Sequence, residues 1–244
     1  AHPFAPDIVH ADVLAGLTGI GSGVADLIIA DPPYNIGKAA WDSIPPREYI
    51  LWCADWISEC ARILKPSGAM YVFGYPRGLA QLMGLMDGHR LIYRDWIVWD
   101  TIMGTGGGLW VTRHEDILYY SKSRDTFEDA DGVKLERHEE NIREYRGVEY
   151  RFKNPSNIWR FPRVDDSALD RTNHPTQKPL ALVERIVRAS SPAGGLVVDP
   201  FVGSGTTCVA AMRQQRQSIG IDNDPDNITI AQARVASWGV EAAR

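Results

Sequence analysis

Four consecutive residues, Asp31-Pro32-Pro33-Tyr34, place a carboxylate, two prolines and an aromatic ring directly after a short apolar segment. The prolines fix the backbone and leave carbonyl oxygens with no neighbouring amide donors. This set suits an exocyclic amine on a planar heterocycle, because Asp31 and the Pro32 carbonyl can accept its two hydrogens while Tyr34 stacks on the ring. Taken alone, the four residues are equally well explained by a proline turn with its tyrosine in the core.

A second segment, Gly203-Ser204-Gly205-Thr206-Thr207, lies between a predicted strand and a predicted helix. Its glycines allow a tight turn and close approach of a ligand, and the amides at the helix start can donate to a small charged group. The loop lacks the lysine of a phosphate loop and is not a full GxGxxG, which argues against ATP and a nicotinamide dinucleotide. Asp222 ends the next predicted strand, seventeen residues beyond Gly205, where it can accept hydrogen bonds from ribose hydroxyls. The pattern predicts an adenosine-containing cofactor, with a purely structural turn as the alternative.

The apolar pattern predicts the strands and helices that carry these motifs. Val24–Ala30 is expected to be a buried strand, Tyr49–Leu64 an amphipathic helix ended by Lys65–Gly68, and Ala69–Phe73 a second buried strand. This βαβ order favours a parallel sheet with helices on its faces. The other predicted strands are Leu91–Trp99, Asp116–Tyr120, Gly195–Val198 and Ser218–Ile221, the other helices are Leu180–Ala189, Cys208–Arg216 and Asp226–Trp238, and Gly104–Gly108 is expected to be a mobile loop.

Length and composition exclude several classes of protein. With 244 residues, 44% hydrophobic and 23% charged, the chain is neither disordered nor collagen-like nor a coiled coil. No window approaches the eighteen apolar residues of a membrane span, and Ala1–His10 lacks the features of a signal peptide, so a cytoplasmic location is expected. Cys53, Cys60 and Cys208 have no CxxC spacing, which predicts reduced, buried thiols and no metal site.

The middle of the chain differs in character from the rest. Ser121–Asp170 is densely charged and has poor apolar periodicity. Its part Arg143–Arg163 holds six basic residues against only Glu144 and Glu149, in a chain whose net charge is -5. They are Arg143, Arg146, Arg151, Lys153, Arg160 and Arg163. The segment is either a solvated surface excursion or a local basic patch for nucleic acid on an acidic body.

Taken together, these motifs resemble those of the amino-group DNA methyltransferases that use S-adenosylmethionine, in the β order of motifs. In that family DPPY is the catalytic motif, and Asp199–Thr207 (DPFVGSGTT) resembles the cofactor loop placed late in the chain. His10-Ala11-Asp12, with Leu14 and Leu17, resembles the GDxLxxL segment with alanine for glycine, and its acid is expected near the cofactor adenine. Ile63–Ala69, His114–Leu118 and His174–Pro179 (HPTQKP) also match, so about three quarters of the chain is covered.

The resemblance implies an α/β, Rossmann-like methyltransferase fold with a doubly wound, mostly parallel sheet. It implies one domain over residues 1–244 with a target-recognition insertion at 121–171, and direct methyl transfer to the amine of a base flipped out of double-stranded DNA. The implied catalytic residues are Asp31, Pro32, Pro33 and Tyr34. The implied cofactor-binding residues are Asp12, Asp199, Phe201, Gly203, Ser204, Gly205, Thr206, Thr207, Asp222 and Lys178, the last toward the methionine carboxylate. The six basic residues of the insertion are expected to contact DNA, and a homodimer is possible.

Three alternatives remain open. Cytosine N4 presents an amine similar to adenine N6, but cytosine members of the family more often begin the motif with serine, so Asp31 favours adenine. Methylation of RNA or protein glutamine is a second alternative, and glutamine methylation is opposed by the late cofactor loop and by the absence of asparagine at position 31. A non-catalytic module of the same fold is the third, and it is opposed by the presence of Asp31, Tyr34 and the loop glycines.

Overall fold

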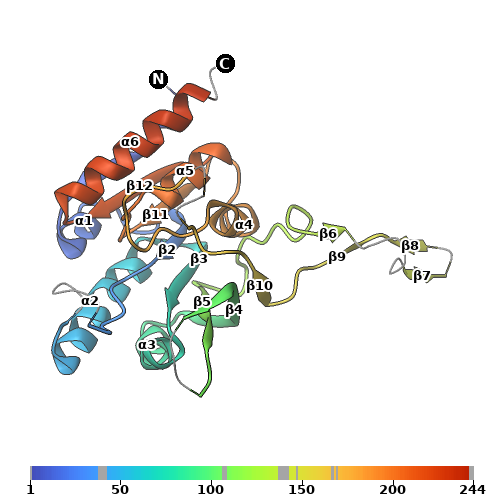
Figure 1. Ribbon diagram of the computed structural model, residues 1–244, viewed down its shortest axis with the longest axis horizontal. Helices are drawn as coiled ribbons and strands as arrows, with labels where there is room; N and C mark the ends of the chain where they lie inside the picture. The colour runs from blue at the N-terminus through green and yellow to red at the C-terminus, as the bar shows by residue number, and fades with distance from the viewer. Residues whose placement is uncertain are drawn as a thin grey trace.

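An eight-stranded mixed sheet forms the centre of the protein (Figure 1). The computed structural model describes residues 2–37, 43–105, 109–136, 143–146, 148–165, 168 and 170–241. The strand order in the sheet is β1-β12-β11-β2-β3-β5-β4-β10. The strands are β1 (Asp7–His10), β2 (Ala25–Ala30), β3 (Leu64–Gly74), β4 (Ile92–Thr105), β5 (Thr112–Ser121), β10 (Ile158–Arg160), β11 (Leu196–Asp199) and β12 (Gln217–Asp222).

The strand directions place most carboxyl ends at one edge of the sheet. β1, β12, β11, β2 and β3 run parallel, whereas β5 is antiparallel to both β3 and β4, and β10 is parallel to β4. After β2 the chain crosses to β3 on one side, and after β11 it crosses to β12 on the other side. β2 and β11 are therefore neighbours whose connections diverge, and ligands of open α/β sheets bind in the crevice outside such a pair.

Helices cover both faces of the sheet, so the fold is the predicted doubly wound α/β arrangement. α1 (Val13–Thr18), α2 (Pro46–Ile63) and α3 (Pro76–Gly88) form one core with the sheet, α4 (Leu180–Ser190) and α5 (Thr206–Arg213) form a second core on the other face, and α6 (Pro225–Glu241) packs on α5. In β2, Ile28 and Ala30 face the first core, and Leu27 and Ile29 face the second. Burial on both faces explains why this strand is apolar from Leu27 to Ala30.

The sequence predicts the main elements but misses some and shifts the ends of others. All predicted strands and helices are present, and the three cysteines are buried. β1, α1 and α3 were not predicted; α3 buries Leu79, Leu82 and Met86, but Gly78 and Gly84 lower its helix propensity. Lys65–Gly68, predicted to end a helix, belongs to strand β3. Pro66 disfavours the helical conformation of Lys65, the residue before it.

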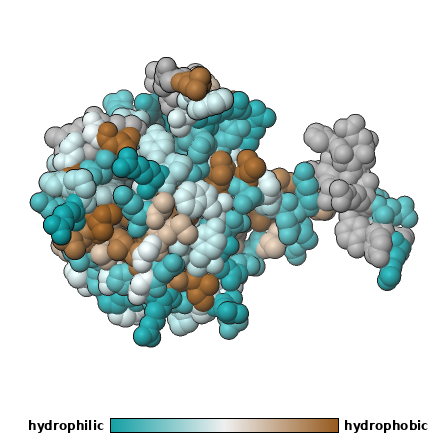
Figure 2. All heavy atoms as spheres, turned by 90° about the horizontal axis from the view of Figure 1, so that it is seen from below, coloured by the Kyte–Doolittle hydropathy of each residue, from teal (hydrophilic) through white to brown (hydrophobic). Residues whose placement is uncertain are grey.

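The predicted insertion divides into an extension and a strand of the main sheet. β6 (Leu135–Glu136) pairs with β9 (Phe152–Lys153), and β7 (Arg143–Tyr145) pairs with β8 (Val148–Tyr150). These two small sheets project away from the body in two perpendicular views (Figures 1 and 2). β10 then returns to the edge of the main sheet, so the boundary at 121–171 stays a prediction. Residues 106–108 of the predicted glycine loop and 137–142 of the insertion lie outside the described residues.

Over the described ranges, no helix is both long enough and apolar enough to cross a membrane.

Gly205 and Gly84 provide a matched test of the backbone at the carboxyl edge of the sheet. Gly205 has φ +77°, and a Cβ atom there would lie 3.0 Å from the Ala231 Cα, whereas Gly84 is in α3 with open space around it. We expect Gly205→Ala to lower the free energy of unfolding by about 1–3 kcal/mol, and Gly84→Ala to raise it by about 0.4–1 kcal/mol. Urea unfolding measures the free energies of unfolding of both variants. Equal changes in the two variants would contradict the claim that the backbone conformation at position 205 requires glycine.

Candidate functional site

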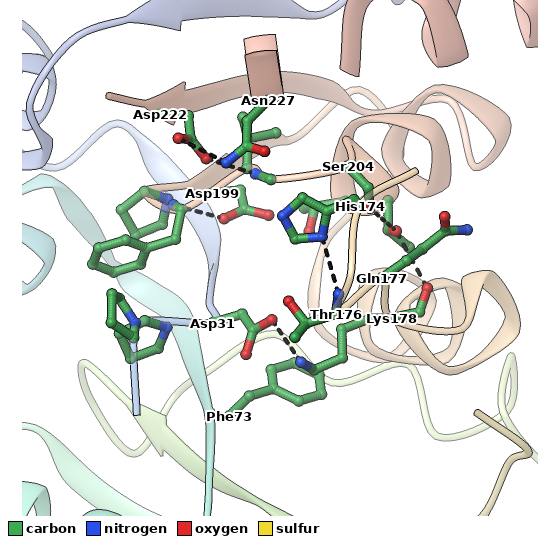
Figure 3. A pocket seen from close by; sticks show the side chains of 18 of the residues that line it. Asp31, Phe73, His174, Thr176, Gln177, Lys178, Asp199, Ser204, Asp222 and Asn227 are labelled. Atoms are coloured by element: carbon green, nitrogen blue, oxygen red, sulfur yellow. Dashed lines mark hydrogen bonds and ion pairs between the residues drawn. The ribbon is translucent and has the colours of Figure 1, made fainter. Parts of the chain in front are cut away.

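A cavity of about 420 Å³ lies at the carboxyl ends of β12, β11 and β2. The glycine loop and the DPPY motif both line it, although they are far apart in the sequence. Figure 3 shows Asp222 on one side of this cavity, Asp31 and Lys178 on the other, and Asp199 between them. The two motifs therefore form one site, as expected for neighbouring strands whose connections diverge.

The glycine loop is held by Asp222 at the end of β12. Gly203 has φ +45° and donates its backbone N–H to Asp222 Oδ2 at 2.9 Å. Asp222 Oδ1 accepts the Asp224 N–H at 3.0 Å and the Asn227 side-chain amide at 3.2 Å. The carboxylate thus links the loop to the start of α6, and a carboxylate with about four acceptor positions retains one for a hydroxyl in the cavity.

Asp12 lies next to Asp222 because β1 and β12 are parallel neighbours. His10 is paired with Asp222, and the Ala11 N–H donates to the Asp222 carbonyl at 3.0 Å. Asp12 caps α1, since its Oδ1 accepts the Leu14 N–H at 2.9 Å, and it also lines the cavity. Two carboxylates at adjacent strand ends therefore form the acidic side of the site.

Apolar rings border this acidic side. Phe201 follows β11, and its ring centroid lies 5.7 Å from that of Trp52 and 5.4 Å from that of Trp56, both on α2. Phe201 and Trp52 line the cavity, so the ring serves both the core and the site. Planar aromatic surfaces beside a carboxylate can hold a heterocycle with polar edges.

Asp199 is almost fully buried between the two halves of the cavity. Its Oδ1 accepts the Phe201 N–H at 2.9 Å. Burial raises the pKa of Asp199 to about 7, against the hydrogen bonds from Thr207 and Phe201 that lower it. A positively charged ligand in the cavity would favour the ionised form of this carboxyl group. The acidic lining therefore fits S-adenosylmethionine, which carries a sulfonium and an ammonium group.

The DPPY motif forms an ion pair that the sequence did not predict. Asp31 Oδ2 lies 2.6 Å from Lys178 Nζ, and Asp31 Oδ1 accepts the Tyr34 hydroxyl at 2.8 Å (Figure 3 shows the pair). Pro33 accepts the Tyr49 hydroxyl at 2.8 Å, which fixes the motif to α2. Burial tends to lower the pKa of Lys178, but the carboxylates of Asp31 and Glu115 outweigh it, so this pKa lies above its usual value.

Tyr34 and Lys178 both contact a second carboxylate, Glu115 on β5. Glu115 Oε2 accepts the Tyr34 hydroxyl at 3.2 Å and lies 3.7 Å from Lys178 Nζ. Glu115 Oε1 pairs with Arg163 at 3.0 Å. Burial, with the charges of Asp31 and Glu115, raises the pKa of Tyr34 well above its usual value, so Tyr34 is a neutral phenol.

The predicted residues are distributed in three ways. All four DPPY residues line the cavity, together with every predicted cofactor-binding residue except Gly205. Lys178 lies against Asp31 rather than near Asp222, and Arg163, predicted to contact DNA, also lines the cavity. Arg146, Arg151, Lys153 and Arg160 lie outside it, and the Arg143 side chain is outside the described part of the structure.

Glu115 and Arg234 are among the residues that the sequence analysis did not assign to the site. Glu115 lies inside a matched motif, but its spacing does not show that it contacts Tyr34 and Lys178. Arg234 of α6 is buried and donates to Thr206 Oγ1 at 2.7 Å and to Asp170 at 2.7 Å, which braces the glycine loop. A basic residue on an amphipathic helix gives no signal of this kind, because most such residues are solvated.

Comparison with known proteins identifies the family. A family model described as DNA methylase, for N6 and N4 methyltransferases, matches residues 25–233. The Type II methyltransferase M.HpaI of Haemophilus parainfluenzae is 35% identical over 94% of this chain and 74% of its own. The DNA adenine methyltransferase YhdJ of Escherichia coli K12 is 34% identical over 95% of this chain and 83% of its own.

A solved structure supports the same fold. The complex of M1.HpyAVI with S-adenosylmethionine superposes with a TM-score of 0.68 at 24% identity, and it covers 94% of this chain and 98% of the other. The chain belongs to the N6/N4 family of DNA methylases. It is an amino-group DNA methyltransferase that uses S-adenosylmethionine.

Replacing Asp222 tests the cofactor side of the cavity. We expect Asp222→Ala to weaken S-adenosylmethionine binding about ten- to a hundredfold, because a charge-assisted hydrogen bond contributes about 1.5–3 kcal/mol. Asp226→Ala is the matched control, since it removes the same charge from the exposed first turn of α6. Calorimetric titration measures both affinities. Equal affinities for the two variants would place the ribose away from Asp222.

Proposed function

We propose that this protein methylates the N6 amine of adenine, after the adenine has been flipped out of double-stranded DNA. The observation that carries the proposal is the position of Asp31. Its carboxylate lies in the cavity at the end of β2, and the neighbouring strand β11 ends in the cofactor loop. The acceptor for an amine and the binding loop for the methyl donor therefore border the same space.

The residues of the DPPY motif are proposed to position the amine. Asp31 and the Pro32 carbonyl accept its two hydrogens, which favours a more tetrahedral nitrogen whose lone pair is free to attack. The bound cofactor supplies an electrophilic methyl group. Correct alignment of two reactants and fixed dipoles are together worth several kcal/mol in enzymes generally. Cys53, Cys60 and Cys208 are all buried and lie outside the lining of the cavity, so none is assigned a part in the reaction.

Tyr34 is proposed to stack on the flipped base. A base inside a duplex cannot reach this cavity, so it has to leave the stack at a cost of a few kcal/mol. Stacking on an aromatic ring returns about 1–3 kcal/mol of this cost. The Tyr34 ring is held at its hydroxyl by Asp31 and Glu115 and contacts the edge of Tyr75, with ring centroids 5.2 Å apart. These contacts fix the ring in the cavity, which supports its assignment as the stacking surface.

Adenine is favoured over cytosine by the residue at position 31 and by one relative. Asp31 begins the motif where cytosine-specific members of the family more often have serine, and YhdJ is named a DNA adenine methyltransferase. Incubation with tritiated S-adenosylmethionine and unmethylated genomic DNA, followed by mass spectrometry of the nucleosides, tests this assignment. N6-methyladenine is the expected product. N4-methylcytosine would show that the target is cytosine instead, and the absence of any methylated nucleoside would refute both assignments.

Asp31→Ala is expected to abolish methyl transfer while cofactor binding is largely retained, because Asp31 is assigned to the target amine. Tyr34→Ala should reduce the rate less, since it removes only stacking and one hydroxyl. Single-turnover transfer and calorimetry with S-adenosylmethionine measure the two properties separately. Loss of cofactor affinity in a folded Asp31→Ala protein would overturn this division of roles.

Double-stranded DNA is proposed to bind along the extension and the end of β10. Arg151 pairs with Glu149 at 2.7 Å, and Arg160 lies 3.6 Å from Asp100, with 46% and 67% of their side chains exposed. Such surface pairs contribute about 0–1 kcal/mol, so phosphate groups can replace them. Hydrophilic residues also predominate at the far described end of the extension (Figure 2). The homodimer stays a prediction from the resemblance.

Alanine at Arg151, Lys153 or Arg160 should weaken binding to all DNA sequences alike. The slope of log affinity against log salt should fall by about 0.9 for each phosphate group that the variant no longer neutralises. A base-reading arginine would instead relax specificity at one position, at a cost of about 1–3 kcal/mol. Binding to cognate and non-cognate duplexes at several salt concentrations separates the two. If alanine at each of the six predicted basic residues changes neither property, the segment is a solvated excursion and DNA binds elsewhere.

A further inference from the structure

Glu115 is a buried carboxylate of the cavity that the proposed mechanism does not use. It is 8% exposed and lies on β5 opposite Trp99 of β4, and both residues line the cavity. Arg163, which also lines the cavity, holds one of its oxygens at 3.0 Å and so fixes the side chain. Burying a carboxylate costs free energy unless the group is paired and hydrogen-bonded, so the partners of Glu115 decide what it does.

Asp31, Tyr34, Glu115 and Lys178 form a closed ring of contacts. Tyr34 joins the two carboxylates through its hydroxyl, at 2.8 Å from Asp31 and 3.2 Å from Glu115. Lys178 joins them on the other side, at 2.6 Å from Asp31 and 3.7 Å from Glu115. The Lys178 side chain is only 10% exposed, so bulk water cannot replace a missing partner. The other ionisable groups near Lys178 are Tyr75 and His174.

The ion pair between Lys178 and Asp31 conflicts with the task proposed for Asp31. Its Oδ1 already accepts the Tyr34 hydroxyl, and its Oδ2 accepts a short, charge-assisted bond from Lys178. Positive charge develops on the target nitrogen during methyl transfer, and an ammonium group on the same carboxylate would repel it. The reaction therefore proceeds better if Lys178 moves away from Asp31 without losing a negatively charged partner.

We propose that Glu115 is a positioning residue, and that it takes over Lys178 when the target amine binds to Asp31. This inference rests on the proposed function of Asp31. Lys178 Nζ has to move toward Glu115 by only about 1 Å to reach the usual 2.7–2.9 Å of a charge-assisted hydrogen bond. The exchange transfers no proton, and Lys178 stays an ammonium ion throughout. Arg163 keeps Glu115 in place during the exchange.

Glu115→Gln tests the proposal, because it keeps the size of the side chain and removes the charge. We expect kcat/KM for DNA to fall about ten- to a hundredfold, chiefly in kcat, with S-adenosylmethionine affinity unchanged. Glu128→Gln is the matched control. Glu128 also accepts from an arginine and a tyrosine, Arg94 at 2.6 Å and Tyr119 at 3.0 Å, but lies outside the cavity lining. It should transfer methyl groups like the wild type.

Double variants show whether Glu115 acts through Lys178 or through Tyr34. In a Tyr34→Phe background, which keeps the ring and removes the hydroxyl, Glu115→Gln should cause its full loss. In a Lys178→Met background it should cause no further loss. A further loss in the Lys178→Met background, with none in the Tyr34→Phe background, would overturn the proposed exchange. If Lys178→Met is inactive, the comparison in the Tyr34→Phe background decides the question alone. If the wild type and Glu128→Gln transfer methyl groups and Glu115→Gln equals them, only this inference fails; an inactive wild type would instead refute the proposed function.

Discussion

The parallel pairing of β2 with β11 is the constraint on which the site depends. Val197 and Val198 are paired with Leu27 and Ile28, so both strands end at the same edge of the sheet. The chain leaves this pair in opposite directions, and a crevice opens where the two connections separate. One wall of the crevice is the segment after β2 and the other is the segment after β11. Residues that lie far apart in the sequence thereby face one cavity without any long loop to carry them.

The charge of the cavity follows from the same arrangement. Asp12, Asp31, Asp199 and Asp222 all lie at or just after the ends of strands, so four carboxyl groups gather at one edge. Their mutual repulsion is reduced in two ways: burial raises the pKa of Asp199 to about 7, and Lys178 pairs with Asp31. Such a cavity disfavours anions and favours a ligand with positive charge. Amides at a helix start by themselves favour an anion. The surrounding carboxyl groups thus explain how this loop can bind a cationic methyl donor.

The sequence predicts residues of the cavity where their position depends on local order, and it misses contacts that depend on the meeting of distant elements. Asp31 and Asp222 were predictable because each ends an apolar strand, and the sheet gathers strand ends at one edge. The contact between Lys178 and Asp31 joins positions 147 apart and depends on how the segment before α4 crosses the end of β2. Glu115 faces the cavity only because β5 runs antiparallel to β3, and an apolar run does not specify strand direction.

The end of the extension is joined to the chemistry of the site by a very short path. β10 pairs with β4 over Ile158–Arg160, and three residues later Arg163 contacts Glu115. Arg163 Nε is buried and has no hydrogen-bond partner within the described part of the protein, so its guanidinium is only partly satisfied. Arg163 thus connects the strand that follows the extension with the carboxylate that lies beside Lys178.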